Sequence, residues 1–96
     1  MADRYPAKNQ DMAWRVYDGQ AVILCPEDST LNTLNAVGTL IWEAADGQTP
    51  LRAMVARICA EFEVEPARAE KDANAFVDEL YRRGLLRTPE SPAAKP

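Results

Sequence analysis

The sequence predicts an α+β domain in which a three-stranded antiparallel sheet is followed by three helices. Apolar residues from Met12 to Leu34 recur with a period of two, and after Leu34 the period changes to 3.6. Strands that precede helices, instead of alternating with them, are typical of an antiparallel sheet with the helices grouped together. The length of 96 residues, 47% of them hydrophobic, allows one small core.

The strongest local signal is Asp18-Gly19, which suits a two-residue type I′ hairpin turn because both central residues must adopt positive φ. A turn there pairs Tyr17 with Gln20 and fixes which side chains share a face. The face expected to meet the core consists of Trp14, Val16, Ala21, Ile23 and Cys25. The opposite, mixed face consists of Arg15, Tyr17, Gln20, Val22 and Leu24.

A second turn at residues 26–29 leads to a short third strand, predicted at Thr30–Leu34. If Leu34 faces the core, Thr30 and Asn32 share its face, and Asn32 is the polar exception there. A slip of the register by one residue would reverse this assignment. The third strand lies at the edge of the sheet, so its free backbone groups could pair with a partner strand.

Start and stop signals divide the remainder into three helices. Asn35 is a good N-cap for the first helix, and Asp46-Gly47 ends it. Thr49-Pro50 begins the second, with threonine as N-cap and proline at the first helical position, and Glu65-Pro66 opens the third in the same way. Arg82–Gly84 closes the third helix, with basic residues in its last turn and glycine beyond it.

Each predicted helix carries an apolar stripe at helical spacing, and these stripes, together with Trp14 and Trp42, are expected to form the core. The stripe residues are Val37, Leu40, Ile41 and Ala44, then Leu51, Met54, Val55, Ile58 and Phe62, then Ala69, Ala73, Phe76, Val77 and Leu80, with Leu85 and Leu86 after them. Gly38 interrupts the first helix, where glycine costs about 1 kcal/mol relative to alanine. It therefore predicts that another group approaches the backbone closely.

The ends of the chain are expected to be disordered tails around one domain. Residues 1–11 are polar and aperiodic, and residues 88–96 hold three of the seven prolines. The domain is therefore expected to span residues 12–87.

Composition argues against several classes of function. With 11 basic and 15 acidic residues the net charge is −4, which disfavours a nucleic-acid partner. Histidine is absent, so the commonest metal ligand and general acid–base group are missing. Cys25 and Cys59 are interpreted as small apolar residues. The sequence also lacks glycine-rich phosphate loops. These observations predict a protein that is not an enzyme and uses no metal or cofactor.

No apolar run approaches the roughly 20 residues that span a bilayer, and no secretory signal precedes the domain. We therefore expect a cytoplasmic protein without a membrane partner.

Four segments in this order and spacing resemble the PqqD family. They are Asp18–Glu27, Leu34–Glu43 with Asp46-Gly47 and Thr49-Pro50 after it, Asp72–Leu80, and Arg83–Leu86. The resemblance covers about residues 12–86. It implies a winged helix-turn-helix domain that acts as a peptide chaperone, the recognition element of ribosomally made and post-translationally modified peptides.

A PqqD-like protein binds the leader of a precursor peptide and presents it to a modifying enzyme, often of the radical SAM type, as in pyrroloquinoline quinone (PQQ) or related biosynthesis. The resemblance further implies that the peptide adds as an extra strand along the third strand, in a groove walled by the third helix. Candidate peptide-binding residues on the strand are Thr30, Leu31, Asn32, Thr33 and Leu34. Those on the helix are Asp72, Phe76, Glu79, Leu80 and Arg83.

Several alternatives stay open from the sequence. Phe76 and Leu80 could be plain core residues, and Glu79 with Arg83 could be a surface ion pair. The domain could instead be a structural homodimer or a subunit of a larger complex that uses the same edge strand, or a DNA-binding winged helix. Composition and periodicity by themselves predict only a small α+β interaction domain.

Overall fold

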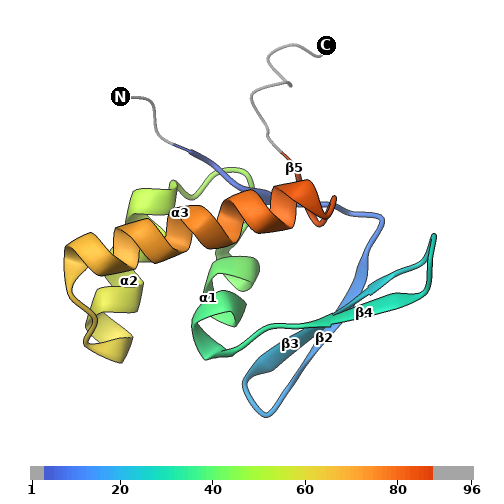
Figure 1. Cartoon of the computed structure of the whole chain (residues 1–96), viewed down its shortest axis with the longest axis horizontal. Helices are drawn as coiled ribbons and strands as arrows, with labels where there is room; N and C mark the ends of the chain where they lie inside the picture. Colours follow the sequence, from blue (N-terminus) through green and yellow to red (C-terminus); the bar gives the residue numbers. More distant parts are fainter. Residues whose placement is uncertain (1–3, 88–96) are drawn as a thin grey trace.

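The structure, a computed structural model, describes residues 4–87. Its elements follow the predicted order of strands and then helices, with one short strand added at each end (Figure 1). They are β1 (Ala7–Lys8), β2 (Ala13–Tyr17), β3 (Gln20–Cys25), β4 (Thr30–Thr33), α1 (Ala36–Ala44), α2 (Leu51–Phe62), α3 (Pro66–Arg82) and β5 (Leu86–Arg87). The sheet β2-β3-β4 and the three helices form the winged helix-like α+β fold that the sequence predicts.

The hairpin β2-β3 has the predicted turn and register. Asp18 and Gly19 have φ of 52° and 77°, as a type I′ turn requires. Tyr17 lies opposite Gln20, and the pairing continues to Ala13 opposite Leu24. The inner face therefore carries the buried residues of β3, and the whole of β2 remains exposed.

The third strand pairs antiparallel with β3, with Asn32 opposite Ile23 and Leu31 opposite Leu24. Leu34 follows the strand and is buried, so the register without a slip is confirmed. The ladder ends at α1, where the Thr39 hydroxyl accepts a hydrogen bond of 2.8 Å from the Ala21 backbone N–H. This buried bond joins the sheet to the first helix.

Two of the predicted helix starts are confirmed and one is shifted. The Asn35 side chain accepts a hydrogen bond from the Gly38 N–H at 2.8 Å, and Pro66 opens α3. Helix α2, however, begins at Leu51, with Pro50 as its N-cap and no side-chain capping bond. Thr49 instead donates its backbone N–H and its hydroxyl to the Asp46 carboxylate.

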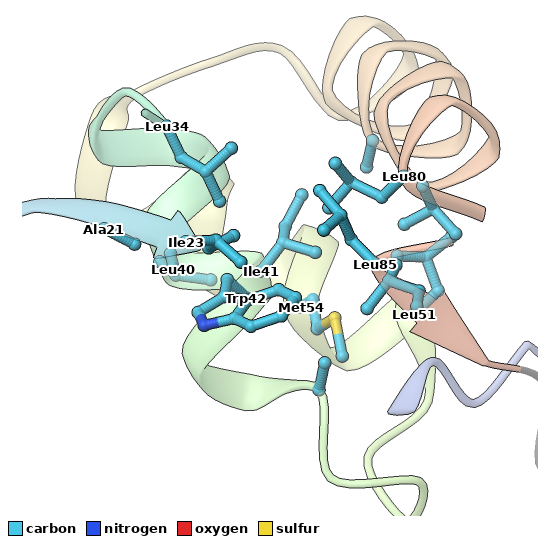
Figure 2. Packing of buried hydrophobic residues seen from close by; sticks show 14 of the residues in the cluster. Ala21, Ile23, Leu34, Leu40, Ile41, Trp42, Leu51, Met54, Leu80 and Leu85 are labelled. Carbon is cyan, nitrogen blue, oxygen red and sulfur yellow. The ribbon is translucent and has the colours of Figure 1, made fainter. Parts of the chain in front are cut away.

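The core joins the inner face of the sheet to all three helices. Figure 2 shows side chains from β3, α1 and α2 and from the end of α3 gathered around Trp42, which is fully buried. Trp14 does not join this core, because it is 39% exposed and packs edge-on against Trp42 at 5.9 Å between ring centres. Phe62 is also exposed, since it lies in the last turn of α2.

The expectation of a disordered tail over residues 1–11 is corrected for residues 4–11. β1 pairs with β5, with Ala7 opposite Arg87, and Pro6 is buried. A two-residue strand has no periodicity, so only its tertiary pairing reveals it. Residues 1–3 and the whole of the predicted tail at 88–96 lie outside the described residues.

Candidate functional site

The free edge of β4 is the first component of the candidate site. The Leu34 N–H donates to the Ala21 carbonyl at 2.8 Å, so the backbone groups of alternate residues toward Thr30 also face β3. The same alternation directs the N–H and C=O groups of Leu31 and Thr33 away from the sheet. Within residues 4–87 no strand pairs with this edge. These backbone groups can therefore hydrogen-bond to an added strand.

Side chains of β4 divide between the two faces of the sheet. Asn32 lies on the inner face, across from buried Ile23, and is half-buried. Leu31 and Thr33 lie on the outer face, and Leu31 is 65% exposed. Asn32 shares the inner face with Thr30 and accepts a hydrogen bond from Arg83 at the end of α3. In β4, therefore, Asn32 contributes its side chain to the inner side of the site, whereas Leu31 and Thr33 contribute their backbone groups at the free edge.

The end of α3 reaches the strand through Arg83. Its Nη1 donates to the Asn32 Oδ1 at 2.8 Å, and its Nε donates to the Glu79 Oε2 at 2.8 Å. Hydrogen bonds from Arg82 first, and from Arg83 second, lower the pKa of the Glu79 carboxyl group. The site therefore has an ionised cluster at this end, which joins β4 to α3.

A hollow of about 250 Å³ lies between α1, the loop after α2, and α3. Asp72 and Phe76 line it from α3, and Asn35 and Gly38 line it from the start of α1. The ring of Phe76 approaches Gly38 so closely that a Cβ there would lie 2.8 Å from its Cζ, which confirms the close approach predicted at this glycine. Most of the exposed lining is apolar, so an apolar side chain fits it.

The lining contains residues that sequence reasoning did not assign to the site. They are Asn35, Val37, Gly38, Ile41, Ile58, Val64, Ala69 and Ala73. Among these residues Gly38 carried a sequence signal of its own, because glycine inside a helix requires a packing reason. The others are typical core or capping residues and carry no separate pattern.

Three of the predicted site residues have structural roles within the domain instead. Leu34 is 6% exposed and Leu80 is 2% exposed, and both belong to the hydrophobic core. The Thr30 hydroxyl donates to the Asp28 carboxylate at 2.7 Å within the turn that precedes β4. Of the remaining seven, Leu31 and Thr33 line the free edge of β4 with their backbone groups. The other five form two groups: Asn32, Glu79 and Arg83 at one end, and Asp72 and Phe76 at the other.

The described residues lack both a cluster of metal-ligating side chains and a helix that could span a membrane. No three His, Cys, Asp or Glu side chains of residues 4–87 gather closely enough to hold a metal ion. No helix in the same part of the chain has the length and hydropathy to cross a membrane. The site offers main-chain hydrogen bonds, an apolar hollow and fixed charges, which are the elements of peptide recognition by strand addition.

A small α+β domain with a free strand edge beside an amphipathic helix defines the class of strand-adding peptide-binding modules. Comparison with protein families shows to which family the chain belongs. The profile of the family described as "Coenzyme PQQ synthesis protein D (PqqD)" matches residues 20–86. The chain belongs to the PqqD family.

Two solved structures have the same fold. One, described as "TbiB1 in Complex with the TbiA(beta) Leader Peptide", is 27% identical with a TM-score of 0.77, over 84% of this chain and 94% of that one. The second, "Lasso peptide synthetase B1 complexed with the leader peptide", is 21% identical with a TM-score of 0.74, over 86% of this chain and 98% of that one. No curated protein matches the sequence.

Proposed function

We propose that this chain binds the leader segment of a ribosomally synthesised precursor peptide as an added strand along β4. The observation that carries the proposal is the free edge of β4 facing the end of α3. Membership of the PqqD family and the similarity to TbiB1 in its leader-peptide complex support it.

The two ends of the site suggest different roles in recognition. Main-chain pairing with Leu31 and Thr33 supplies affinity that does not depend on the peptide sequence. The hollow at Asp72 and Phe76 accepts an apolar side chain of the peptide. Arg83 and Glu79 select polar or charged positions near the other end, where Arg83 donates a hydrogen bond to Asn32.

The chain then presents the bound leader to the enzyme that modifies the rest of the precursor, a radical SAM enzyme by family resemblance. It acts as a carrier with no bond chemistry of its own, in the cytoplasm where the precursor is synthesised. A DNA-binding winged helix is disfavoured, because α3 carries Glu70, Asp72, Asp78 and Glu79 on its surface.

An amide NMR titration tests the proposal. The ¹⁵N-labelled 96-residue chain is titrated with a synthetic leader from the precursor-like reading frame nearest its gene. We expect the main shifts at residues 30–34 and 72–83, accompanied by shifts of the other residues that line the hollow. Shifts on α2 alone would retain peptide binding but contradict this site, and an absence of shifts at high peptide excess would contradict the function.

A further inference from the structure

Among the described residues, no helix packs on the outer face of the sheet β2-β3-β4. Figure 1 shows the three helices grouped to one side of this sheet. The outer face consists of eight side chains: Ala13, Arg15, Tyr17, Gln20, Val22, Leu24, Leu31 and Thr33. Tyr17, Leu24 and Leu31 are 58%, 38% and 65% exposed, and a shallow hollow of about 260 Å³ lies among them.

The composition of this face is that of a protein interface. Charged residues make up 27% of the chain, yet the eight positions hold no lysine and no carboxylate. Tyr17 and Arg15 are residue types enriched at the centres of interfaces, and Val22, Leu24 and Leu31 add apolar area around them. An ordinary solvated sheet face would carry alternating polar and charged side chains instead.

Arg15 is the single charge on the outer face. It makes no hydrogen bond, ion pair or ring contact within residues 4–87. It lies directly across from Val22, with Tyr17 two positions along its own strand. Within residues 4–87 no carboxylate pairs with this exposed guanidinium, so a carboxylate of a partner that covers the face can pair with it.

A second copy of this chain does not fit as that partner. Two outer faces packed together would enclose two Arg15 side chains and no carboxylate, which leaves buried like charges unpaired. Three strands of five, six and four residues cover at most roughly 14 Å by 20 Å, or about 280 Å². This is well below the ~800 Å² per partner of a stable interface.

We propose that the outer face docks the enzyme that modifies the bound peptide, through an apolar segment that carries a carboxylate opposite Arg15. The inference rests on the proposed function. Because the leader would extend the same sheet beyond β4, the outer face and the added strand form one continuous surface. An enzyme on this surface contacts carrier and leader together, which enlarges the interface that the face alone offers.

The test separates enzyme docking from leader binding. The probes are the peptide-modifying enzyme encoded beside this chain's gene and a fluorescently labelled synthetic leader, each titrated with the full 96-residue chain. Arg15→Glu and Leu24→Gln are expected to raise the Kd for the enzyme at least tenfold. Both should leave the Kd for the leader unchanged within a factor of two.

Arg57→Glu is the matched control. It makes the same charge change on α2, away from the outer face, and should leave both Kd values unchanged. Thermal melts of each variant establish that it folds, and Arg15→Gln provides a milder change at the same position.

The outcomes distinguish the two proposals. If the wild-type chain binds the leader, but the enzyme fails to bind or binds wild type and Arg15→Glu equally, the docking surface is wrong and the peptide carrier stands. If the wild-type chain does not bind the leader, the proposed function itself fails. A dimer in sedimentation velocity that Arg15→Glu abolishes would overturn enzyme docking in favour of a second copy.

Discussion

The carboxylate of Glu79 organises the charged end of the candidate site. It accepts hydrogen bonds from Arg82 and Arg83, and Arg83 in turn donates to Asn32 on β4. The position of the guanidinium that faces the strand edge therefore depends on the ionisation of a neighbouring acid. At neutral pH the acid is charged, and the connection between α3 and β4 is intact.

We expect the Glu79 carboxyl group to titrate below its ordinary pKa of 4.5. A pKa that is lower in the folded state stabilises the fold above the unfolded-state pKa, and this contribution is lost as pH falls through the folded-state pKa. Arg82→Ala should raise the Glu79 pKa more than Arg83→Ala, because Arg82 is its larger cause. ¹³C NMR of the carboxyl carbon measures this, with Arg57→Ala as a control that leaves it unchanged. Equal titration of Glu79 in all variants would refute the assigned cause.

The contact between Gly38 and Phe76 shapes the apolar hollow. A Cβ at position 38 would lie 2.8 Å and 3.0 Å from two carbons of the Phe76 ring. Alanine gains about 1 kcal/mol in a helix interior, but overpacking costs roughly 1–3 kcal/mol. We expect Gly38→Ala to lower the free energy of unfolding by about 1 kcal/mol.

The same substitution should change sign once the ring is shortened. In a Phe76→Leu background, Gly38→Ala is expected to raise the free energy of unfolding by up to about 1 kcal/mol. Urea denaturation of the four proteins completes the cycle. An identical effect of Gly38→Ala in both backgrounds would show that the ring is not what requires glycine.

Strand β4 combines two functions in four residues. The backbone groups of Thr30 and Asn32 face β3 and complete the ladder with it. Those of Leu31 and Thr33 face the free edge and are available for a partner strand. Proline removes one N–H donor, so its effect depends on which side that donor faces. The register therefore distinguishes substitutions that affect binding from those that affect folding.

We expect Thr33→Pro to weaken leader binding at least tenfold while the domain stays folded. The Thr33 N–H faces the free edge, and the rigid ring also blocks close approach of an added strand. Thr33→Ala, which keeps the N–H, should bind normally. Asn32→Pro removes a donor that faces β3 and should destabilise the fold. Fluorescence anisotropy with a labelled leader and thermal melts measure the two effects. Normal binding by Thr33→Pro would exclude strand addition at β4.

Local signals explain why the hairpin and helices could be predicted from the sequence. Asp18-Gly19 fixed the hairpin register, and Asn35 and Pro66 marked helix starts, because each acts through backbone geometry within a few residues. Tertiary arrangements carry no such signal. The bond between Arg83 and Asn32 spans 51 positions, and the missing cap of α2 is supplied from the N-terminal segment.

The N-terminal segment, residues 4–9, hydrogen-bonds to several elements that are distant from it in the sequence. Its carbonyl at Arg4 accepts from the Leu51 N–H at 2.7 Å, and its N–H at Asn9 donates to the Leu85 carbonyl at 2.9 Å. The Arg4 side chain also donates to Asn74 and to Asp78 on α3. The first residues thus connect the start of α2, the middle of α3 and the chain after α3.

Removal of residues 2–11 is therefore expected to destabilise the whole domain. Besides the β1-β5 ladder, four backbone hydrogen bonds join residues 4–9 to the rest of the described chain, those of Lys8 and Pro6 in addition to the two above. At about 0.5–1.5 kcal/mol each, together with the burial of Pro6, they predict a loss of about 3–5 kcal/mol. For a domain of this size the Tm should fall by more than about 12 °C.

Differential scanning calorimetry measures this loss, with removal of residues 2 and 3 alone as the control. An unchanged Tm for the longer truncation would mean that the domain begins near Met12, as periodicity alone suggests. Leader binding provides a second readout. A truncated chain that still folds at low temperature should bind the leader with unchanged Kd. The reason is that, among the described residues, no hydrogen bond joins β4 or Arg83 to residues 4–11.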